Sequence, residues 1–351
     1  MPSLFDTFKL RSVTMRNRIA VSAMCQFSAE EDGSATDWHL VHLGARAVGG
    51  AGLITTEMTA IEQDGRLSDQ DLGIYSDLHI GPLQKIVDFV HQNGSVIAIQ
   101  LGHAGRKAFT STKGERVPKS LIGASPIPFH ESWTIPTELK QSDIDDIITH
   151  FINAAIRSEK AGFDGIQIHA AHGYLIHQFL SPLSNHRHDE YGGNFENRIR
   201  LLETIIKEVR QVISQETFIT VRLSCTDWID GGWDIIQSVK LSKILKDLGV
   251  DLIDCSSGGI SPLQNIPVGA GYQIPFSETI KREANIQTSS VGMITTPNLA
   301  DEIIRNNRAD IVTIGREELR DPYFPLHAAT ELGIDLKYWP KQYSLAKPKV
   351  V

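Results

Sequence analysis

The chain has 351 residues, 41% of them hydrophobic, and a formal net charge of −8 from 34 basic and 42 acidic side chains. This length and composition fit a soluble globular protein with a large core, and the absence of a basic block argues against nucleic acid as a partner. No apolar run reaches membrane-spanning length, and the three cysteines, Cys25, Cys225 and Cys255, form no CxxC pair. We therefore expect a cytoplasmic protein that binds neither nucleic acid nor a membrane and that holds no metal.

Short β-rich apolar runs alternate along the chain with longer amphipathic stretches. Strands are predicted over residues 18–24, 52–57, 96–101, 165–169, 218–224, 251–255, 287–292 and 310–315. Helices are predicted over 38–48, 79–92, 143–160, 196–213, 235–248, 276–282, 297–306 and 317–332. Eight strand–helix units favour a closed parallel barrel, and the GxGxxG turn that a Rossmann fold needs is missing. The prediction is an α/β protein of the (β/α)₈ TIM-barrel class, with residues 1–351 in a single domain.

Two connections are unusually long, at about residues 102–140 and 170–195. Both follow strands, the third and the fourth, so in a barrel they lie at the carboxyl end of the strands, where barrel enzymes build their active sites. We interpret them as lid insertions within the single domain.

Polar side chains stand near the ends of three neighbouring strands. Gln100, His169 and Arg222 lie on alternating positions that place them on the same face as the barrel interior. A buried polar group without a partner costs about 2–7 kcal/mol, so these groups must bind either each other or a ligand. A ligand is favoured, because barrel mouths bind ligands.

The last two strands end in glycine, at Gly292 and Gly315, and Arg316 follows the second. The loops after strands seven and eight form the common phosphate site of TIM barrels, and an arginine adds a charge-assisted contact. A phosphate site opposite an amide, a guanidinium and an imidazole suits a planar phosphorylated cofactor such as FMN. Each glycine alone could equally be a simple turn residue.

Longer motifs give a family resemblance. The segment from His169 through His172-Gly-Tyr174 to Ser-Asn185 resembles the Old Yellow Enzyme family of FMN-dependent ene-reductases, and most closely its thermophilic-type, YqjM-like subgroup. Other matching motifs are Ser22-Ala-Met-Cys25, Asp69-Gln-Asp-Leu-Gly73, Gln100-Leu-Gly-His-Ala-Gly-Arg-Lys107, Asp254-Cys-Ser-Ser-Gly258, Val291-Gly-Met and Gly315-Arg316. The resemblance extends from about Leu4 to Pro325.

The resemblance implies a mechanism. His169 and His172 would donate hydrogen bonds to the carbonyl oxygen of an α,β-unsaturated substrate, and Tyr174 would protonate the α-carbon. NADPH, or NADH, would reduce FMN, which would then pass a hydride to the β-carbon in a ping-pong cycle. The residues expected to line FMN, with Gly292 from the phosphate site, are Ser22, Ala23, Met24, Cys25, Met58, Gln100, Arg222, Gly292, Gly315 and Arg316.

Two positions depart from the subgroup. Phe27, expected to contact the substrate, stands where a tyrosine is common, and no arginine occurs at Tyr343-Ser344-Leu345, where relatives reach into a partner's site. A homodimer or homotetramer is expected from the resemblance alone.

Other interpretations remain open. Cys25 could be an ordinary buried thiol, Tyr174 a loop aromatic, and the HxxH pair a metal motif, although it lacks helical spacing. An FMN-dependent dehydrogenase or demethylase of a catabolic pathway is the alternative enzyme. A non-catalytic flavin-binding barrel is disfavoured by the intact histidine–tyrosine set. The segment His103, Arg106 and Lys107 has no assigned role.

Overall fold

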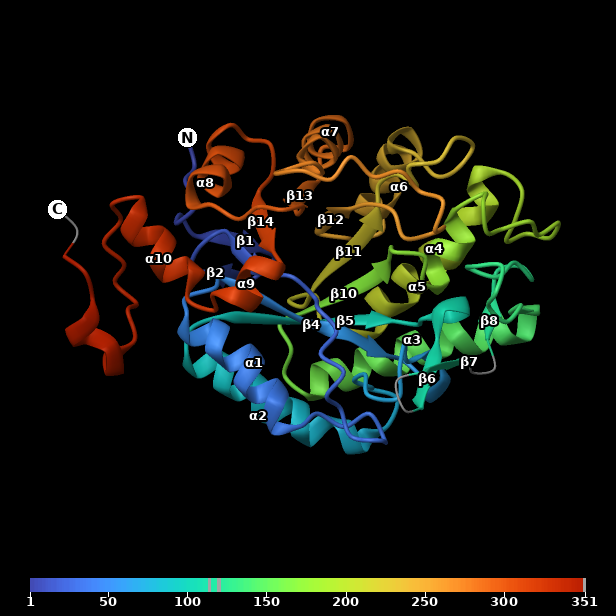
Figure 1. Cartoon of the computed structure of the whole chain (residues 1–351), viewed down its shortest axis with the longest axis horizontal. Helices are drawn as coiled ribbons and strands as arrows, with labels where there is room; N and C mark the ends of the chain where they lie inside the picture. The colour runs from blue at the N-terminus through green and yellow to red at the C-terminus, as the bar shows by residue number, and fades with distance from the viewer. Residues whose placement is uncertain (113–114, 119–120, 350–351) are drawn as a thin grey trace.

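Eight parallel strands close into a barrel in the computed structural model, which describes residues 1–112, 115–118 and 121–349 (Figure 1). Each strand pairs with its neighbours in chain order, and β14 closes the ring against β3. The barrel strands are β3 (Ile19–Val21), β4 (Leu53–Ala60), β5 (Val96–Gly102), β10 (Gly165–Ala170), β11 (Phe218–Ser224), β12 (Leu252–Ser256), β13 (Gln287–Ser290) and β14 (Ile311–Ile314). All eight predicted strands are confirmed, so the fold is a TIM barrel.

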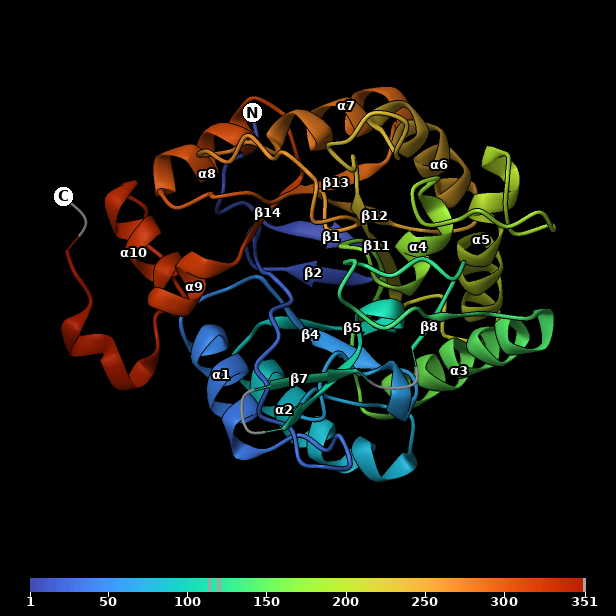
Figure 2. The same cartoon turned by 45° about the vertical axis from the view of Figure 1, so that its right-hand side comes forward.

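Helices surround the barrel in both cartoon views (Figures 1 and 2). They are α1 (Asp37–Val48), α2 (Ile80–Gln92), α3 (Gln141–Lys160), α4 (Leu175–Leu180), α5 (Phe195–Val212), α6 (Ile235–Asp247), α7 (Ile274–Ala284), α8 (Pro297–Arg305), α9 (Arg316–Arg320) and α10 (Phe324–Glu331). The single helix predicted over 317–332 is wrong, because the chain breaks at Asp321-Pro322 into α9 and α10. Proline lacks the N–H that a continuous helix requires at that point. No helix in the described part of the chain is both long and apolar enough to cross a bilayer.

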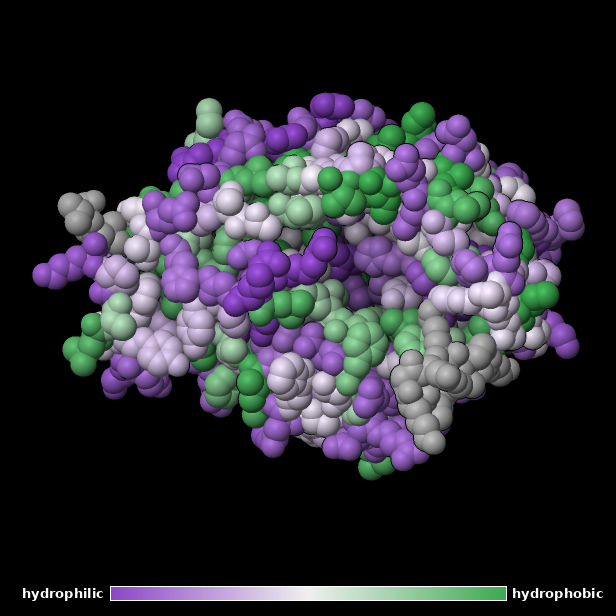
Figure 3. Space-filling model, in the orientation of Figure 1, coloured by the Kyte–Doolittle hydropathy of each residue, from purple (hydrophilic) through white to green (hydrophobic). Residues whose placement is uncertain are grey.

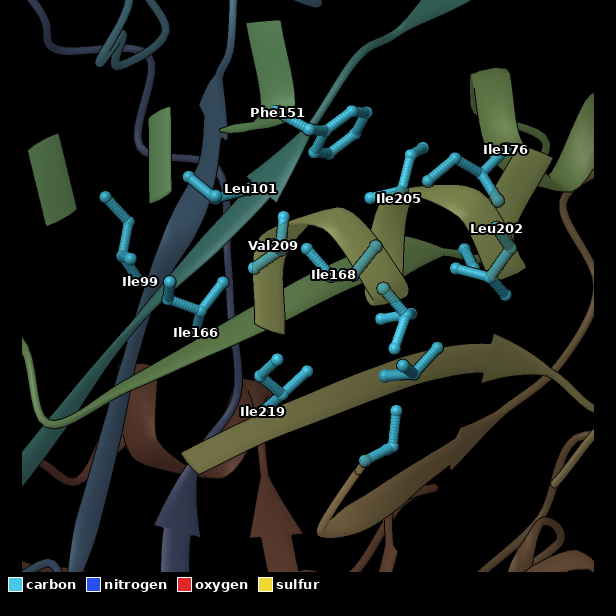
Figure 4. Packing of buried hydrophobic residues seen from close by; sticks show 14 of the residues in the cluster. Ile99, Leu101, Phe151, Ile166, Ile168, Ile176, Leu202, Ile205, Val209 and Ile219 are labelled. Atoms are coloured by element: carbon cyan, nitrogen blue, oxygen red, sulfur yellow. The ribbon is translucent and has the colours of Figure 1, made fainter. Parts of the chain in front are cut away.

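Side-chain alternation along the strands separates two kinds of environment. Ile166 and Ile168 of β10 point outward and pack with Leu202 and Ile205 of α5 in the core between barrel and helices (Figure 4). The residues between them, Gln167 and His169, therefore face the barrel interior. The same alternation holds in β5 and β11, where the outward residues are apolar and join the outer core, while Gln100 and Arg222 face the interior toward the carboxyl ends of the strands.

An antiparallel hairpin, which the sequence analysis did not predict, precedes the barrel. It consists of β1 (Phe8–Leu10) and β2 (Val13–Met15). Its buried residues pack against interior side chains from the first part of the strands, including Ala98 and Phe218. The hairpin therefore seals the amino-terminal end of the barrel and leaves the carboxyl end as the site for a ligand.

The two long insertions lie after β5 and β10, as predicted. The first contains the hairpin of β6 (Phe109–Thr112) and β7 (Glu115–Pro118) and the short pair of β8 (Ile122–Gly123) and β9 (Thr137–Glu138). Within the predicted span 102–140, residues 113–114 and 119–120 lie outside the described residues. The second insertion carries α4.

Candidate active site

A buried chain of polar side chains crosses the barrel interior. Gln100 donates its amide to Gln167 over 2.6 Å, and Gln167 lies 3.4 Å from Asp254. Arg222 pairs with Asp254 at 3.3 Å and donates to Ser22 Oγ over 2.9 Å. The predicted gathering of Gln100 and Arg222 is therefore confirmed, and part of their hydrogen bonding is satisfied within the barrel itself.

This network leaves some of its polar atoms unsatisfied. Arg222 Nε is close enough to Asp254 for an ion pair but lacks hydrogen-bond geometry, and Asp254 Oδ1 has no partner among the described residues. Burial raises the pKa of Asp254, although the positive charge of Arg222 opposes that shift. The incomplete pairing directs Arg222 toward a further polar ligand.

A cavity of about 250 Å³ opens at the ends of β13 and β14. Its lining comprises Arg222, Ser256, Tyr272, Gln273, Val291, Gly292, Met293, Ile294, Thr295, Thr313, Gly315, Arg316, Glu317 and Arg320. The space-filling view shows a hollow in the middle of the molecule with hydrophilic residues inside it and hydrophobic residues on parts of its rim (Figure 3). Two larger surface hollows, of about 560 and 690 Å³, are lined by other residues and include none of the predicted site.

The chemistry of the cavity fits the phosphate and polar edge of FMN. The side chain of Arg316 forms no hydrogen bond or ion pair with the described residues, whereas the side chain of Arg320 pairs with Glu317. Gly292 has φ +125°, a conformation that L side chains rarely adopt, so the backbone can run close to a ligand there. A guanidinium without a side-chain partner, next to backbone that lines the same cavity, is a suitable receptor for a phosphate.

The remaining cofactor-lining predictions fall into two groups. Gly315 is adjacent to Ser22 and Met24, because an added Cβ would lie 3.7 Å from Ser22 Cβ and 3.8 Å from Met24 Sδ. Met58 lies on the other side of the mouth, where a Cβ on Gly102 would be 2.7 Å from Met58 Cγ and 3.2 Å from His169 Cβ. Ala23 and Cys25 follow Ser22 in the segment after β3 and are partly buried.

The histidine pair stands at the end of β10 on a specialised turn. His172 has φ +59°, which is rare for a residue with a Cβ, and Gly173 follows with φ +74°. A side chain on Gly173 would collide with the carbonyl of Gly259, at 2.1 Å from the added Cβ. The backbone N–H of His172 donates to Ser224 Oγ over 2.9 Å. These contacts fix the tight turn that brings the second imidazole back toward the first.

The rings of His169, His172 and Tyr174, which together form the predicted carbonyl clamp and its proton donor, contact one another. The centroids of His169 and His172 are 5.1 Å apart, and those of His169 and Tyr174 are 4.9 Å apart, both edge to face. The three residues predicted to bind and protonate the substrate therefore form one cluster. Tyr174 also packs against the small apolar cluster to which Met58 belongs.

Both imidazoles are held in the neutral form. Burial lowers the pKa of His169 and of His172 well below the ordinary value, and the charge of Arg222 lowers both further. His169 Nδ1 accepts a hydrogen bond from Ala171 N over 3.3 Å, which places the single proton on Nε2. His172 Nε2 lies 2.7 Å from Ser256 Oγ, and because a hydroxyl can donate or accept, this contact holds the ring with either tautomer. A neutral imidazole with a positioned N–H donates a hydrogen bond without placing a full charge in the site.

Two supporting contributions were missed by the sequence analysis. Lys107 donates to the carbonyl of His172 over 2.8 Å and to that of Gly259 over 3.1 Å. Ser256 and Ser224 hold the ring and backbone of His172. Lys107 and Ser256 occur in motifs that carried the family resemblance, which was the available signal, whereas Ser224 lies outside those motifs; spacing alone gives none of the three a partner.

Other predicted residues are less closely connected to the cluster. Phe27 has φ +52° and is 45% exposed, and among the described residues no ring contact joins it to the histidines or Tyr174.

Burial, followed by the nearby charges of Asp71 and Glu57, raises the pKa of Cys25 well above its usual value. The thiol is therefore protonated and is not a resting nucleophile. Cys225 and Cys255 are buried in the core, as expected.

Comparison with known proteins agrees with this geometry. The sequence profile of the NADH:flavin oxidoreductase / NADH oxidase family matches residues 3–334. An NADPH dehydrogenase of Bacillus cytotoxicus is 47% identical over 348 residues, which are 99% of this chain and 97% of that protein. The structure of an Old Yellow Enzyme homologue from Zymomonas mobilis superposes with a TM-score of 0.79 at 27% identity and covers 100% of this chain and 99% of the other.

A longer protein shares the barrel as well. A 2-naphthoyl-CoA reductase superposes with a TM-score of 0.85 at 24% identity, over 95% of this chain but only 52% of the other, and this likeness shows the fold alone. The match of nearly the whole chain to one family profile and the high identity to the bacterial dehydrogenase confirm the resemblance drawn from the motifs. The chain belongs to the NADH:flavin oxidoreductase / NADH oxidase family, with an Old Yellow Enzyme type of barrel.

Proposed function

We propose that the chain is an FMN-dependent ene-reductase that uses NADPH to reduce activated C=C bonds of α,β-unsaturated carbonyl compounds. The observation that carries this proposal is the cluster of His169, His172 and Tyr174 at the mouth of a barrel with an unpaired arginine in the adjoining cavity. The family match supports flavin chemistry, and the name of the bacterial relative supports NADPH as the reductant.

The histidine pair binds the carbonyl oxygen of the substrate. Two neutral imidazoles, each with one N–H, lie edge to face with their ring centroids 5.1 Å apart, and their N–H groups are assigned to the oxygen on which negative charge develops as the double bond is reduced. Preorganised donors of this kind stabilise an enolate more than the ground-state carbonyl, and one such donor is typically worth about 10²–10³ in rate. His169 and His172 therefore act as an oxyanion-binding pair.

Tyr174 supplies the proton that completes the reduction. Its ring lies edge to face against His169 and also packs against the apolar group that contains Met58. A phenol is a suitable general acid for a carbon that carries enolate character. Phe27, with its exposed ring, is proposed to contact the apolar part of the substrate rather than its carbonyl.

Residues on several strand ends would hold FMN. Arg316 and the backbone at Gly292 and Gly315 are suited to the phosphate, while Gln100 and Arg222 offer an amide and a cation to the polar edge of the ring. Ser22, Ala23, Met24, Cys25 and Met58 complete the lining. When bound, FMN would supply hydride-transfer chemistry between NADPH and the β-carbon of the alkene.

The experiment that tests this proposal uses anaerobic rapid mixing. NADPH should bleach the yellow holoprotein in a first half-reaction, and 2-cyclohexenone should restore the colour in a second. A substrate-driven reduction of the flavin that needs no nicotinamide would instead indicate the catabolic dehydrogenase or demethylase. A protein that takes up no FMN would refute both.

We further propose that residues 1–351 form one FMN-binding domain and that the protein acts in the cytoplasm as a homodimer or homotetramer. The C-terminal segment after α10 lies at the edge of the molecule and exposes Tyr343 and Leu345 (Figure 2). Sedimentation equilibrium of the holoprotein tests the assembly, and a monomer at micromolar concentration would contradict it.

A further inference from the structure

One thiol and two carboxyl groups from separate segments meet beside the barrel mouth. Cys25 lies after β3, Glu57 lies in β4 and Asp71 lies in the loop after β4. One ligand atom from each residue is within 4.8 Å of the other two. Glu57 and Asp71 are buried, while Cys25 is partly exposed. This set thus combines one sulfur and two carboxylates, with access from one side.

Glu57 is firmly oriented. It lies where the pairing of β4 with β5 shifts register, between Thr55 and Met58. Its oxygens are 3.0 Å from His39 Nε2 and 3.0 Å from the backbone N–H of Gln26. Because each carboxylate oxygen has two lone-pair directions, these bonds hold Glu57 in place and leave acceptor capacity unused.

Asp71 provides an independent sign that the cluster lacks a partner. Its side chain has no exposed surface, and its Oδ2 accepts a hydrogen bond from Ser68 N. Its Oδ1 has no hydrogen-bond partner among the described residues. A buried acceptor left in this state costs about 1–3 kcal/mol, and more when it is charged. The carboxyl therefore has a free ligand atom in a desolvated place, next to another carboxylate and a thiol.

We propose that Cys25, Glu57 and Asp71 form a binding site for a thiophilic divalent cation of the Zn²⁺ class. Zn²⁺ binds thiolate sulfur at about 2.3 Å and carboxylate oxygen at about 2.0–2.2 Å, usually in a tetrahedron. Ligand atoms of such a tetrahedron are roughly 3.5 Å apart. Side-chain rotations that move the ligand atoms by about 1 Å therefore suffice to close the site. Mg²⁺ and Ca²⁺ prefer oxygen ligands alone, and the sulfur therefore selects against them.

Coordination replaces protons in the cluster. The Cys25 thiol loses its proton to solvent as the sulfur–metal bond forms, and any proton held between the two carboxyls leaves in the same way. No electron is transferred. The fourth position of the tetrahedron remains for water. The sequence analysis expected no metal, because ligands from three separate segments share no recognisable spacing.

Occupancy of the site should affect the enzyme. Cys25 directly follows Met24, which lines the proposed FMN site, so a metal on the thiol should slow turnover; this consequence rests on the proposed function. Metal binding itself does not depend on the proposed function, because it can be measured without any enone.

Titration of the yellow holoprotein with Cd²⁺, an analogue of Zn²⁺, provides the test. One equivalent should bind and produce ultraviolet sulfur-to-cadmium charge-transfer absorption, and Zn²⁺ should displace it. Cys25→Ser should abolish the band, and Asp71→Asn should weaken binding at least tenfold. The control Asp64→Asn, an exposed carboxyl near the same loop, should bind Cd²⁺ like the parent. Undiminished binding by the Cys25→Ser or Asp71→Asn protein, or the absence of saturable binding by the parent, would overturn the proposal.

A second measurement needs no variant. Zn²⁺ should protect Cys25 of the parent protein from alkylation, as read from the mass of the peptide that contains it. Equal alkylation with and without Zn²⁺ would contradict the site. A cadmium band in a protein that reduces no enone would support the metal site and refute the proposed function. Enone reduction by a protein that shows no cadmium band would support the proposed function and refute the metal site.

Discussion

Replacing Arg316 with methionine should weaken cofactor binding without weakening the fold. The guanidinium has no partner in the described chain, so its removal breaks no intramolecular bond and should change the stability of the apoprotein by no more than about 0.5 kcal/mol. In the holoprotein it is proposed to bind the phosphate of FMN. A hydrogen bond to a charged group contributes about 1.5–3 kcal/mol, which corresponds to an increase in the dissociation constant of roughly 10- to 150-fold.

The assay has two parts. Quenching of flavin fluorescence on addition of apoprotein gives the dissociation constant, and thermal unfolding is measured with and without FMN. Ligand binding stabilises the folded state by RT ln(1 + [L]/Kd), so the variant should lose part of the FMN-dependent rise in Tm while its apoprotein unfolds as before. Arg282→Met, an exposed arginine outside the cavity, is the matched control. An unchanged dissociation constant, or an apoprotein that unfolds at a much lower temperature, would refute the assignment.

Three further predictions concern the clamp and its surroundings. Lys107→Met removes two charged hydrogen bonds from backbone carbonyls, one of them at the strained His172, and should lower kcat for enone reduction about 10- to 100-fold while FMN content is unchanged, as measured by steady-state kinetics. Gly292→Ala forces a side chain into φ +125° near Gln273 and should reduce FMN affinity and holoprotein Tm; unaltered binding would show that the turn is not needed. Because the folded-state pKa values of His169 and His172 are lowered, the unfolded chain binds more protons below about pH 6.5, so stability is present above that pH and falls as the pH decreases. Urea unfolding at pH 5 and pH 7 should show this loss, and a His172→Gln protein should show less of it.

The barrel was predictable because each strand carries its pattern locally. In β10 the outward residues are isoleucines and the inward residues are Gln167 and His169, so period-two alternation alone assigns both faces. The break at Asp321-Pro322 was also readable from the proline, but the helical pattern on both sides concealed it.

The features that the sequence analysis did not predict depend on contacts between segments that are distant in the sequence. The β1–β2 hairpin is short and gains its stability by covering the barrel floor, which no local pattern reveals. Similarly, Asp254 pairs with Arg222 across neighbouring strands, and Lys107 reaches loops that follow two other strands. Side chains of this kind acquire partners only after closure of the barrel, so sequence spacing cannot assign them.

The contacts of Lys107 also bear on how this enzyme could be altered. One ammonium group joins the turn after β10 to the loop after β12, while its own backbone belongs to the insertion after β5. Neighbouring Arg106 adds a bond from the same insertion to Ile260. Hydrogen bonds thus link the loops after β5, β10 and β12 to one another, so replacement with loops from a relative should be tolerated only when all three are replaced together. Grafting a single loop from a relative to broaden the range of alkenes would misplace His172, whereas transplanting all three together should preserve the clamp.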